Sequence, residues 1–360
     1  MDLPLFMRFV PEVRGSERIG GYTPRQRDDG FATEEDPVAE LITRAVPIGI
    51  SACVYRCPVR YNGKSFDALA MLGRERSDFA FTPVCPECMA GLGVPRMPIH
   101  LTGPGQEVLE GEARVRDRRG RDVTDALVEG SRACLTALER AGVRAMIVKE
   151  SSPSCGVYKA KVGKKRAEQV EGSGVFGAML LETGWFLIPD SALANPLLWW
   201  DWRRRLHAWL WLADREIDRA RDLYDAWHVV KFILQETSRP FADAMGRELA
   251  ALPKNPSAAT LEDARARILD ALRTPSTRPR IRQALWKTYI NAKKHGKLDG
   301  IEVHELKVDS PEVTANLMQI VAEITTLERV SFENDLLFGT SPVLRRDARR
   351  VRARDASKEE

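Results

Sequence analysis

Short apolar runs that end in loops of small or polar residues constrain the fold of this 360-residue chain more than any other feature. Four segments have this form: 46–55 (VPIGISACVY), 79–87 (FAFTPVCPE), 143–156 (VRAMIVKESSPSCG) and 173–189, in which a short helix precedes the run WFLIP. Each run has the length and the β-branched or aromatic content of a buried strand. Between the second and third runs, residues 122–142 have helical spacing, with Asp122 or Thr124 as the N-cap and Gly142 after the last turn. Strands that alternate with helices predict a parallel sheet.

The composition and the residue pattern change along the chain and predict four parts. Residues 1–45 form an irregular arm, and 46–195 form the α/β domain. Residues 196–340 read as an all-α helical domain, introduced by a segment that holds six of the eight tryptophans. We interpret these rings as packing between the two domains rather than as a cofactor site. The basic end of the chain, 341–360, is predicted to be disordered.

Three cysteines each follow a predicted strand. Cys53, Cys85 and Cys155 stand in the loops after the first three runs. Parallel sheets bind ligands at the carboxyl ends of their strands, so these thiols are expected at one edge of the sheet. Soft thiolates select zinc, Cu(I) or an iron–sulfur cluster. A cubane held by three thiolates leaves one iron without a protein ligand; Cys88, which completes a Cys-x-x-Cys with Cys85, is a possible fourth ligand that would close it.

The start of the chain lacks the basic region, apolar region and cleavage site of a signal peptide, so we expect a cytoplasmic protein. In a reducing compartment its six cysteines are expected as thiols or metal ligands rather than disulfides. The net charge of +4 is too small to indicate a partner, but two segments concentrate basic residues. These segments are 159–166 and 273–297, and both are candidate phosphate-binding surfaces.

At this point the motifs resemble a known family. ISACVYRCPVRYNG, FTPVCPE, GLGVPRMP, RGRDVTDALVEG, VKESSPSCG and GSGVFGAMLLETGW occur in the order typical of thiouracil desulfurases, over about residues 46–190. The resemblance implies a Rossmann-like α/β fold and an oxygen-sensitive 4Fe–4S cluster on Cys53, Cys85 and Cys155. It also implies that Glu87 is the active-site acid and that Ser152 has a catalytic role, with Ser154 as the alternative proton donor.

Several positions depart from the family pattern. Asn62 replaces an acid, His100 stands where another acid is usual, and Arg56 replaces a glycine. The acid that closes the last strand is displaced, with Asp190 the nearest. These departures leave the exact substrate and the activity as open questions. The role of Lys149 at the end of the third strand is also left open.

The helical part resembles a domain often fused to this family, most clearly over 274–296 and more loosely over 227–250. In such fusions the helical part is thought to hold tRNA, which implies a thiolated uridine as substrate, 4-thiouridine first. The candidate phosphate contacts are basic residues of the two segments named above: Lys159, Lys161, Lys164, Lys165, Arg166, Arg280, Arg282, Lys287, Lys293 and Lys294.

We therefore expect an iron–sulfur-dependent tRNA thiouridine desulfidase. Two alternatives stay open: a desulfurase of a free thiobase such as 2-thiouracil, and a non-catalytic cluster-bearing protein that binds RNA or senses oxygen.

Overall fold

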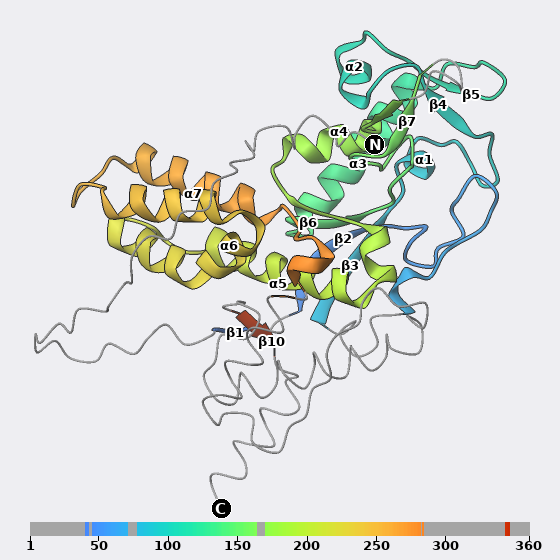
Figure 1. The fold of residues 1–360 in the computed structure, drawn as a ribbon. Coiled ribbons are helices and arrows are strands. Elements are labelled where there is room, and N and C mark those ends of the chain that lie inside the picture. Colours follow the sequence, from blue (N-terminus) through green and yellow to red (C-terminus); the bar gives the residue numbers. More distant parts are fainter. Residues whose placement is uncertain are drawn as a thin grey trace, which may run out of the picture. The chain divides into compact units, whose positions relative to one another are not determined.

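A computed structural model describes residues 40–42, 45–70, 78–163, 170–281, 283 and 343–345. All of them belong to one compact unit, residues 37–360. Its centre is a parallel sheet of strand order β3-β2-β6-β9 (Figure 1). The strands are β2 (Val46–Ser51), β3 (Phe79–Val84), β6 (Ala145–Val148) and β9 (Phe186–Pro189). The predicted α/β class and its parallel sheet are confirmed.

Helices cover both faces of this sheet. The alternation of side chains along β6 shows why: Met146 and Val148 pack with Phe176 in one buried cluster, whereas Ala145 and Ile147 belong to the cluster on the other face. The first face carries α3 (Thr124–Arg140) and α4 (Val175–Glu182), and the second carries α5 (Pro196–Ala213). With both faces covered, β6 is apolar and buried along its whole length, whereas the edge strand β3 keeps two exposed residues.

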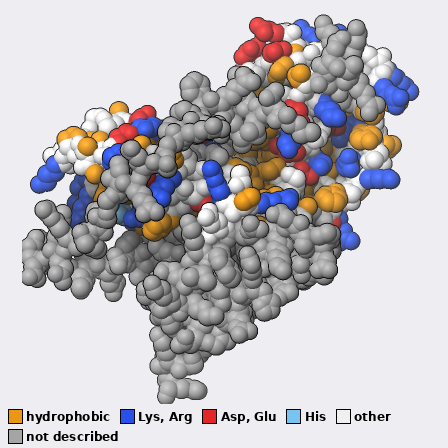
Figure 2. Space-filling view, in the orientation of Figure 1, with side chains coloured by type: hydrophobic (Ala, Val, Ile, Leu, Met, Phe, Trp, Pro, Cys, Tyr) orange, Lys and Arg blue, Asp and Glu red, His pale blue; other side chains and the backbone are white. Residues whose placement is uncertain are grey.

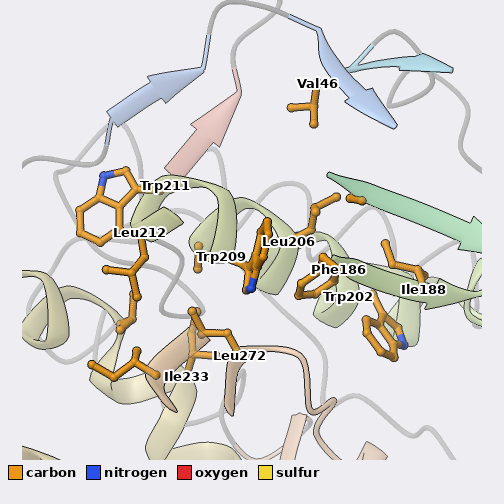
Figure 3. Close-up of a cluster of buried hydrophobic side chains, with 14 of the residues drawn as sticks. Val46, Phe186, Ile188, Trp202, Leu206, Trp209, Trp211, Leu212, Ile233 and Leu272 are labelled. Atoms are coloured by element: carbon orange, nitrogen blue, oxygen red, sulfur yellow. The ribbon is translucent and has the colours of Figure 1, made fainter. Parts of the chain in front are cut away.

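The tryptophan-rich segment forms α5, and its rings pack against the sheet. Trp202 lies against Phe186 (Figure 3), edge-on at a centroid distance of 5.7 Å. Trp199 meets Phe79 at 5.8 Å. Asn195 caps the helix by accepting hydrogen bonds from the backbone N–H groups of Leu197 and Leu198. The interpretation of these rings as packing residues is confirmed. Two further helices, α6 (Ala220–Ala250) and α7 (Ala258–Leu272), complete the cluster on this side.

A buried ionic cluster joins α5 to α6. Arg204 Nη2 lies 2.5 Å from Asp201 Oδ1 and 2.5 Å from Glu236 Oε1, and Arg205 Nε lies 3.1 Å from Asp201. Arg205 also donates to the hydroxyl of Ser276 at 2.8 Å. Buried charges persist in a fold only when they are paired in this way.

A second, mixed sheet of order β5-β4-β7-β8 lies outside the expectations from sequence. Its strands have three residues each: β4 (Ile99–Leu101), β5 (Val115–Asp117), β7 (Ala160–Val162) and β8 (Val170–Gly172). The remaining elements are α1 (Pro86–Met89), α2 (Gly105–Glu110), the 3₁₀ helix Asp190–Ala194, and a parallel pair of β1 (Glu40–Ile42) with β10 (Val343–Arg345). Among the described helices, none is long and apolar enough to cross a membrane.

Candidate active site

The three strand-end cysteines meet at one edge of the parallel sheet. Cys53 follows β2, Cys85 follows β3 and Cys155 lies in the loop after β6, and these three strands are adjacent in the order β3-β2-β6. The thiol of Cys155 lies near both other thiols, and the hydroxyl of Ser51, at the end of β2, donates a hydrogen bond to it. The structure thus brings together the three cysteines that the sequence placed after strands.

All three thiols are held in apolar surroundings. Burial raises the pKa of Cys85 to about 12, and burial likewise raises the pKa values of Cys53 and Cys155. Lys149 and Arg60 oppose this effect at Cys53. A thiol with a raised pKa stays protonated near neutral pH unless a cation compensates the charge of the thiolate.

The donor set fits a cluster with several metal atoms. Within the described residues, no three His, Cys, Asp or Glu side chains lie close enough to share one metal ion. An iron–sulfur cluster instead takes its cysteines on separate irons, and thiolates are its usual ligands. Three thiols on three adjacent strand ends therefore suit such a cluster in the chemistry of their donors.

Glu87 links these cysteines to the serines of the 149–156 loop. It stands in the first turn of α1, two residues after Cys85. The hydroxyl of Ser154 donates a hydrogen bond to Glu87 Oε1 at 2.7 Å, and Arg96 donates to Oε2 at 2.6 Å. Ser154 is almost fully buried. A carboxylate with one oxygen on a hydroxyl and the other on a guanidinium is fixed in orientation.

Ser152 has a different surrounding from Ser154. Its hydroxyl oxygen accepts hydrogen bonds from the backbone N–H groups of Ser154 and Cys155, both at 3.2 Å. This is the local turn bonding expected of a serine before a proline. Its own O–H proton is not used by these two bonds, so the hydroxyl still has a proton to donate.

Glycines allow α4 to lie directly against the loop that carries Cys155. The backbone N–H of Gly174 donates to the carbonyl of Gly156 at 2.7 Å, and that of Gly177 donates to Ser154 at 3.0 Å. A Cβ at Gly174 would stand 2.5 Å from the carbonyl oxygen of Ser154, and one at Gly177 would overlap that of Gly156. The motifs SPSCG and GSGVFG are therefore two halves of one packed unit.

Lys149, whose role the sequence left open, belongs to an ion pair at the strand ends. Its Nζ lies 2.6 Å from Asp190 Oδ2, and Asp190 Oδ1 accepts the backbone N–H of Glu150 at 3.0 Å. The backbone N–H of Lys149 donates to Ser51 Oγ at 3.0 Å. The displaced acid Asp190 thus connects β9 to β6 and places a cation near Cys53.

The other departures from the motif pattern have separate places. Asn62 is exposed and its Oδ1 accepts the backbone N–H of Lys64 at 3.1 Å, which is the bonding of a turn. His100 lies in β4 of the second sheet. Arg56 has φ of +70°, a left-handed conformation that favours glycine.

Comparisons with known proteins agree with this arrangement. A family model for 2-thiouracil desulfurase matches residues 48–191. The uncharacterized protein YbbK of Bacillus subtilis (strain 168) is 32% identical over 149 residues, which cover 41% of this chain and 98% of that protein. This chain belongs to the 2-thiouracil desulfurase family. A solved structure described as a 4Fe-4S-dependent thiouracil desulfidase, TudS, has 30% sequence identity and a TM-score of 0.34, over 41% of this chain and 93% of that one.

The family match includes the three strand-end cysteines, Glu87 and the serines of the 149–156 loop, but ends before α5. The resemblance of the helical part to a fused tRNA-binding domain therefore stays a prediction. As a member of a desulfurase family, the chain is expected to act as an enzyme on a thiolated pyrimidine.

Only part of the expected basic surface can be located. Lys159, directly before β7, and Lys161, in its middle, are exposed, four and six positions after Cys155. Arg280 donates to the backbone carbonyl of Thr237 at 2.5 Å. The remaining candidates lie outside the described residues: Lys164, Lys165, Arg166, Arg282, Lys287, Lys293 and Lys294. On the face shown in Figure 2, Lys and Arg side chains of the described part lie among hydrophobic and acidic ones.

Two residues near the desulfurase motifs were not recognised from the sequence. Glu150 is buried, and its Oε2 accepts the backbone N–H of Lys159 at 3.0 Å, which joins the cysteine loop to β7. The second residue is Arg96, which forms an ion pair with Glu87. Glu150 could have been found as an acid directly after a predicted strand, and Arg96 as a residue of the motif GLGVPRMP.

Proposed function

We propose that this chain is an iron–sulfur-dependent desulfidase that converts the C=S group of a thiolated uridine in tRNA into C=O, with 4-thiouridine as the leading substrate. The observation that carries the proposal is the hydrogen bond of 2.7 Å between Ser154 and Glu87, beside one buried and two partly buried thiols at adjacent strand ends. An acid, a hydroxyl and a soft metal-binding triad are the groups that this reaction requires.

Cys53, Cys85 and Cys155 would hold a 4Fe–4S cluster. When bound by three thiolates, such a cluster supplies one iron without a protein ligand, which has Lewis-acid character towards sulfur. Cys88 is left out of this set because its thiol donates to the carbonyl of Val59 at 3.9 Å and lies 3.9 Å from Arg96 Nη1.

The chain's own residues would manage protons and water. Replacing C=S by C=O consumes one water and releases hydrogen sulfide, so the net reaction is a hydrolysis without an electron donor. Glu87 Oε1 would accept a proton from the attacking water, as a general base. A serine hydroxyl would donate a proton to the ring nitrogen; Ser154 is already linked to Glu87, while Ser152 keeps its proton available.

The basic strand next to the site favours a polynucleotide over a free base. Lys159, directly before β7, and Lys161, within it, are exposed, and Glu150 ties the start of this strand to the loop of Cys155 by accepting the backbone N–H of Lys159. Phosphate contacts from lysine supply much of the affinity for RNA. A thiouridine within tRNA would have to leave its stack and enter the site as a flipped base.

A free thiobase is the second candidate, and the family description itself favours it, because it names 2-thiouracil. A base of this size needs no phosphate contacts. The two candidates therefore differ in whether the lysines of β7 matter for turnover.

Sulfide release tests these candidates. Protein reconstituted anaerobically with iron and sulfide, then freed of excess, is mixed with tRNA containing 4-thiouridine or with free 2-thiouracil. We expect sulfide from the tRNA, and a Lys159→Glu, Lys161→Glu double variant that loses at least tenfold in rate on tRNA. An Arg239→Glu variant, whose ion pair with Asp243 is exposed, is the matched control. Release from 2-thiouracil alone supports the second candidate, and no release from either contradicts both.

A further inference from the structure

The guanidinium of Arg96 forms a buried ion pair with Glu87. Its Nε and Nη2 both lie 2.6 Å from Glu87 Oε2, and its Nη1 donates to the carbonyl of Gly93 at 3.0 Å. The side chain is only 5% exposed, and that of Glu87 is 15% exposed. Ion pairs on the surface contribute little, but a pair this buried fixes both partners in one geometry.

The backbone of Arg96 is held as firmly as its side chain. Its N–H donates to the carbonyl of Tyr61 at 2.9 Å, so the loop after α1 is joined to the loop after β2. The same guanidinium lies 3.9 Å from the thiol of Cys88. Arg96 therefore connects two pieces of the site that are separate in sequence: the loop after Cys53, and the turn of Cys85 and Cys88 that also carries Glu87.

We propose that Arg96 is a positioning residue that holds Glu87 in the orientation needed for proton transfer. The inference rests on the proposed function, in which Glu87 is the general base. The two oxygens of Glu87 have different partners: Oε2 is occupied by Arg96, and Oε1 faces the hydroxyl of Ser154. Arg96 thus leaves one oxygen for chemistry and directs it at the loop that carries Cys155.

A glutamate side chain rotates about three torsions. Without Arg96, the carboxylate of Glu87 would keep the hydrogen bond from Ser154 and lose those from the guanidinium, so its orientation would be less restricted. Displacement of a catalytic group by about 1 Å costs on the order of 10²-fold in rate. The residue need not touch the substrate to have this effect, because it acts through Glu87.

The test compares Arg96→Gln and Arg96→Lys with Arg267→Gln. Arg267 makes a similar two-point pair with Glu248, at 2.6 and 2.9 Å, between α6 and α7. Iron content, thermal midpoint, kcat and KM are measured on reconstituted proteins with whichever of 4-thiouridine tRNA or 2-thiouracil the unaltered protein converts. We expect Arg96→Gln to lower kcat by about 10²-fold with KM within about twofold and unchanged iron. Arg96→Lys should retain more activity, and Arg267→Gln all of it.

A crystal structure of Arg96→Gln provides a readout that does not depend on activity. The expected result is loss of the hydrogen bond between Glu87 and Ser154. Retention of that bond, or of the kcat of the unaltered protein, overturns the inference while leaving the proposed function intact. Loss of iron together with a lowered thermal midpoint also overturns it, since Arg96 would then only maintain the fold. If the unaltered protein releases no sulfide from either substrate, the proposed function fails, and the crystal structure still decides whether Arg96 positions Glu87.

Discussion

Ser154 Oγ donates a hydrogen bond of 2.7 Å to Glu87 Oε1, across 67 positions of sequence. This bond joins the loop after β6 to the helix α1 that follows β3, and it places an acid and a hydroxyl beside the cysteines of both loops. The pairing predicts that the two side chains act together in proton transfer.

Replacing Glu87 by Gln is expected to lower turnover by on the order of 10²–10⁴-fold, which is the usual contribution of a general base. The amide has nearly the same shape and still accepts from Ser154, so the cysteines should keep their positions. Sulfide release and the visible absorbance of the reconstituted protein are measured on the same samples. Full turnover by the variant would remove Glu87 from the mechanism.

Replacing Gly177 by Ala should disrupt the loop of Cys155. The added methyl group would overlap the carbonyl of Gly156, which belongs to backbone and cannot move aside easily. We expect a loss of about 1–3 kcal/mol in the free energy of unfolding, measured by urea denaturation, and reduced iron binding. Gly172→Ala is the control, because its methyl group would meet side-chain atoms rather than backbone, Val162 at 3.3 Å and Pro104 at 3.8 Å. Equal effects of the two substitutions would argue against this packing role.

Arg56→Gly is expected to stabilise the protein. Arg56 has φ of +70°, which costs an L-residue roughly 1–2 kcal/mol, and its side chain is 77% exposed with a carboxylate of Asp67 no nearer than 3.8 Å. Glycine relieves the strain but loses about 0.5–1 kcal/mol through greater freedom of the unfolded chain. A net gain of roughly 0.5–1 kcal/mol in the free energy of unfolding should result. A decrease would show that Arg56 makes a stabilising contact that outweighs the strain.

Acid should weaken the link between α5 and α6. Burial alone raises the pKa of Asp201, but the cations of Arg205 and Arg204 outweigh burial and hold that pKa below its ordinary value. The folded state therefore binds fewer protons at this group than the unfolded chain does. Its contribution is present above the unfolded pKa of about 4 and is lost as the pH falls below it.

The urea midpoint between pH 7 and pH 3 measures this contribution. Asp201→Asn should be less stable at pH 7 by about 3–5 kcal/mol, because it removes a buried carboxylate that two buried arginines share, and should show a shallower decline with acid. Asp225→Asn, which removes an exposed partner of Arg221, is the control. An unchanged decline in Asp201→Asn would assign the acid sensitivity to other carboxylates.

The parallel sheet could be predicted because its strands are buried on both faces. Residues 46–51 and 145–148 are apolar runs of strand length, and burial on both sides is what makes a run continuous. The helix Thr124–Arg140 was predictable from its spacing, but the prediction of Asp122 or Thr124 as its N-cap was wrong, because the N-cap is Val123. Asp122 lies one residue before the cap, and its Oδ1 accepts the backbone N–H of Thr124 at 2.9 Å.

The second sheet could not be predicted, because its strands are short and are not apolar runs. Strands of three residues, such as Ala160–Val162, are too short for an alternating pattern to be visible, and exposed lysines flank the buried positions. Segment 159–166 therefore read as a basic loop, although its first half is a strand. Likewise, the Gly and Pro residues after Cys88 made a helix there doubtful, and the structure has only the short helix Pro86–Met89.

Within the site, the sequence indicated the residue types but not the contacts between them. That Cys53, Cys85 and Cys155 share an edge follows from strand order, which the alternation of elements predicts. The pairing of Glu87 with Ser154 rather than with Ser152 depends on the path of one loop. The ion pair of Arg96 with Glu87 depends on the path of another loop, the one after α1, and sequence periodicity does not predict loop paths.

The most direct test of the central claim is the iron content of purified protein after anaerobic reconstitution, compared among the unaltered chain, Cys155→Ser and Cys134→Ser. Cys134 lies buried on α3 in the apolar cluster, where a structural role is expected. The account predicts about four irons per chain in the unaltered protein and in Cys134→Ser, and a large loss in Cys155→Ser. Full iron content in Cys155→Ser, or none in the unaltered chain, would contradict it.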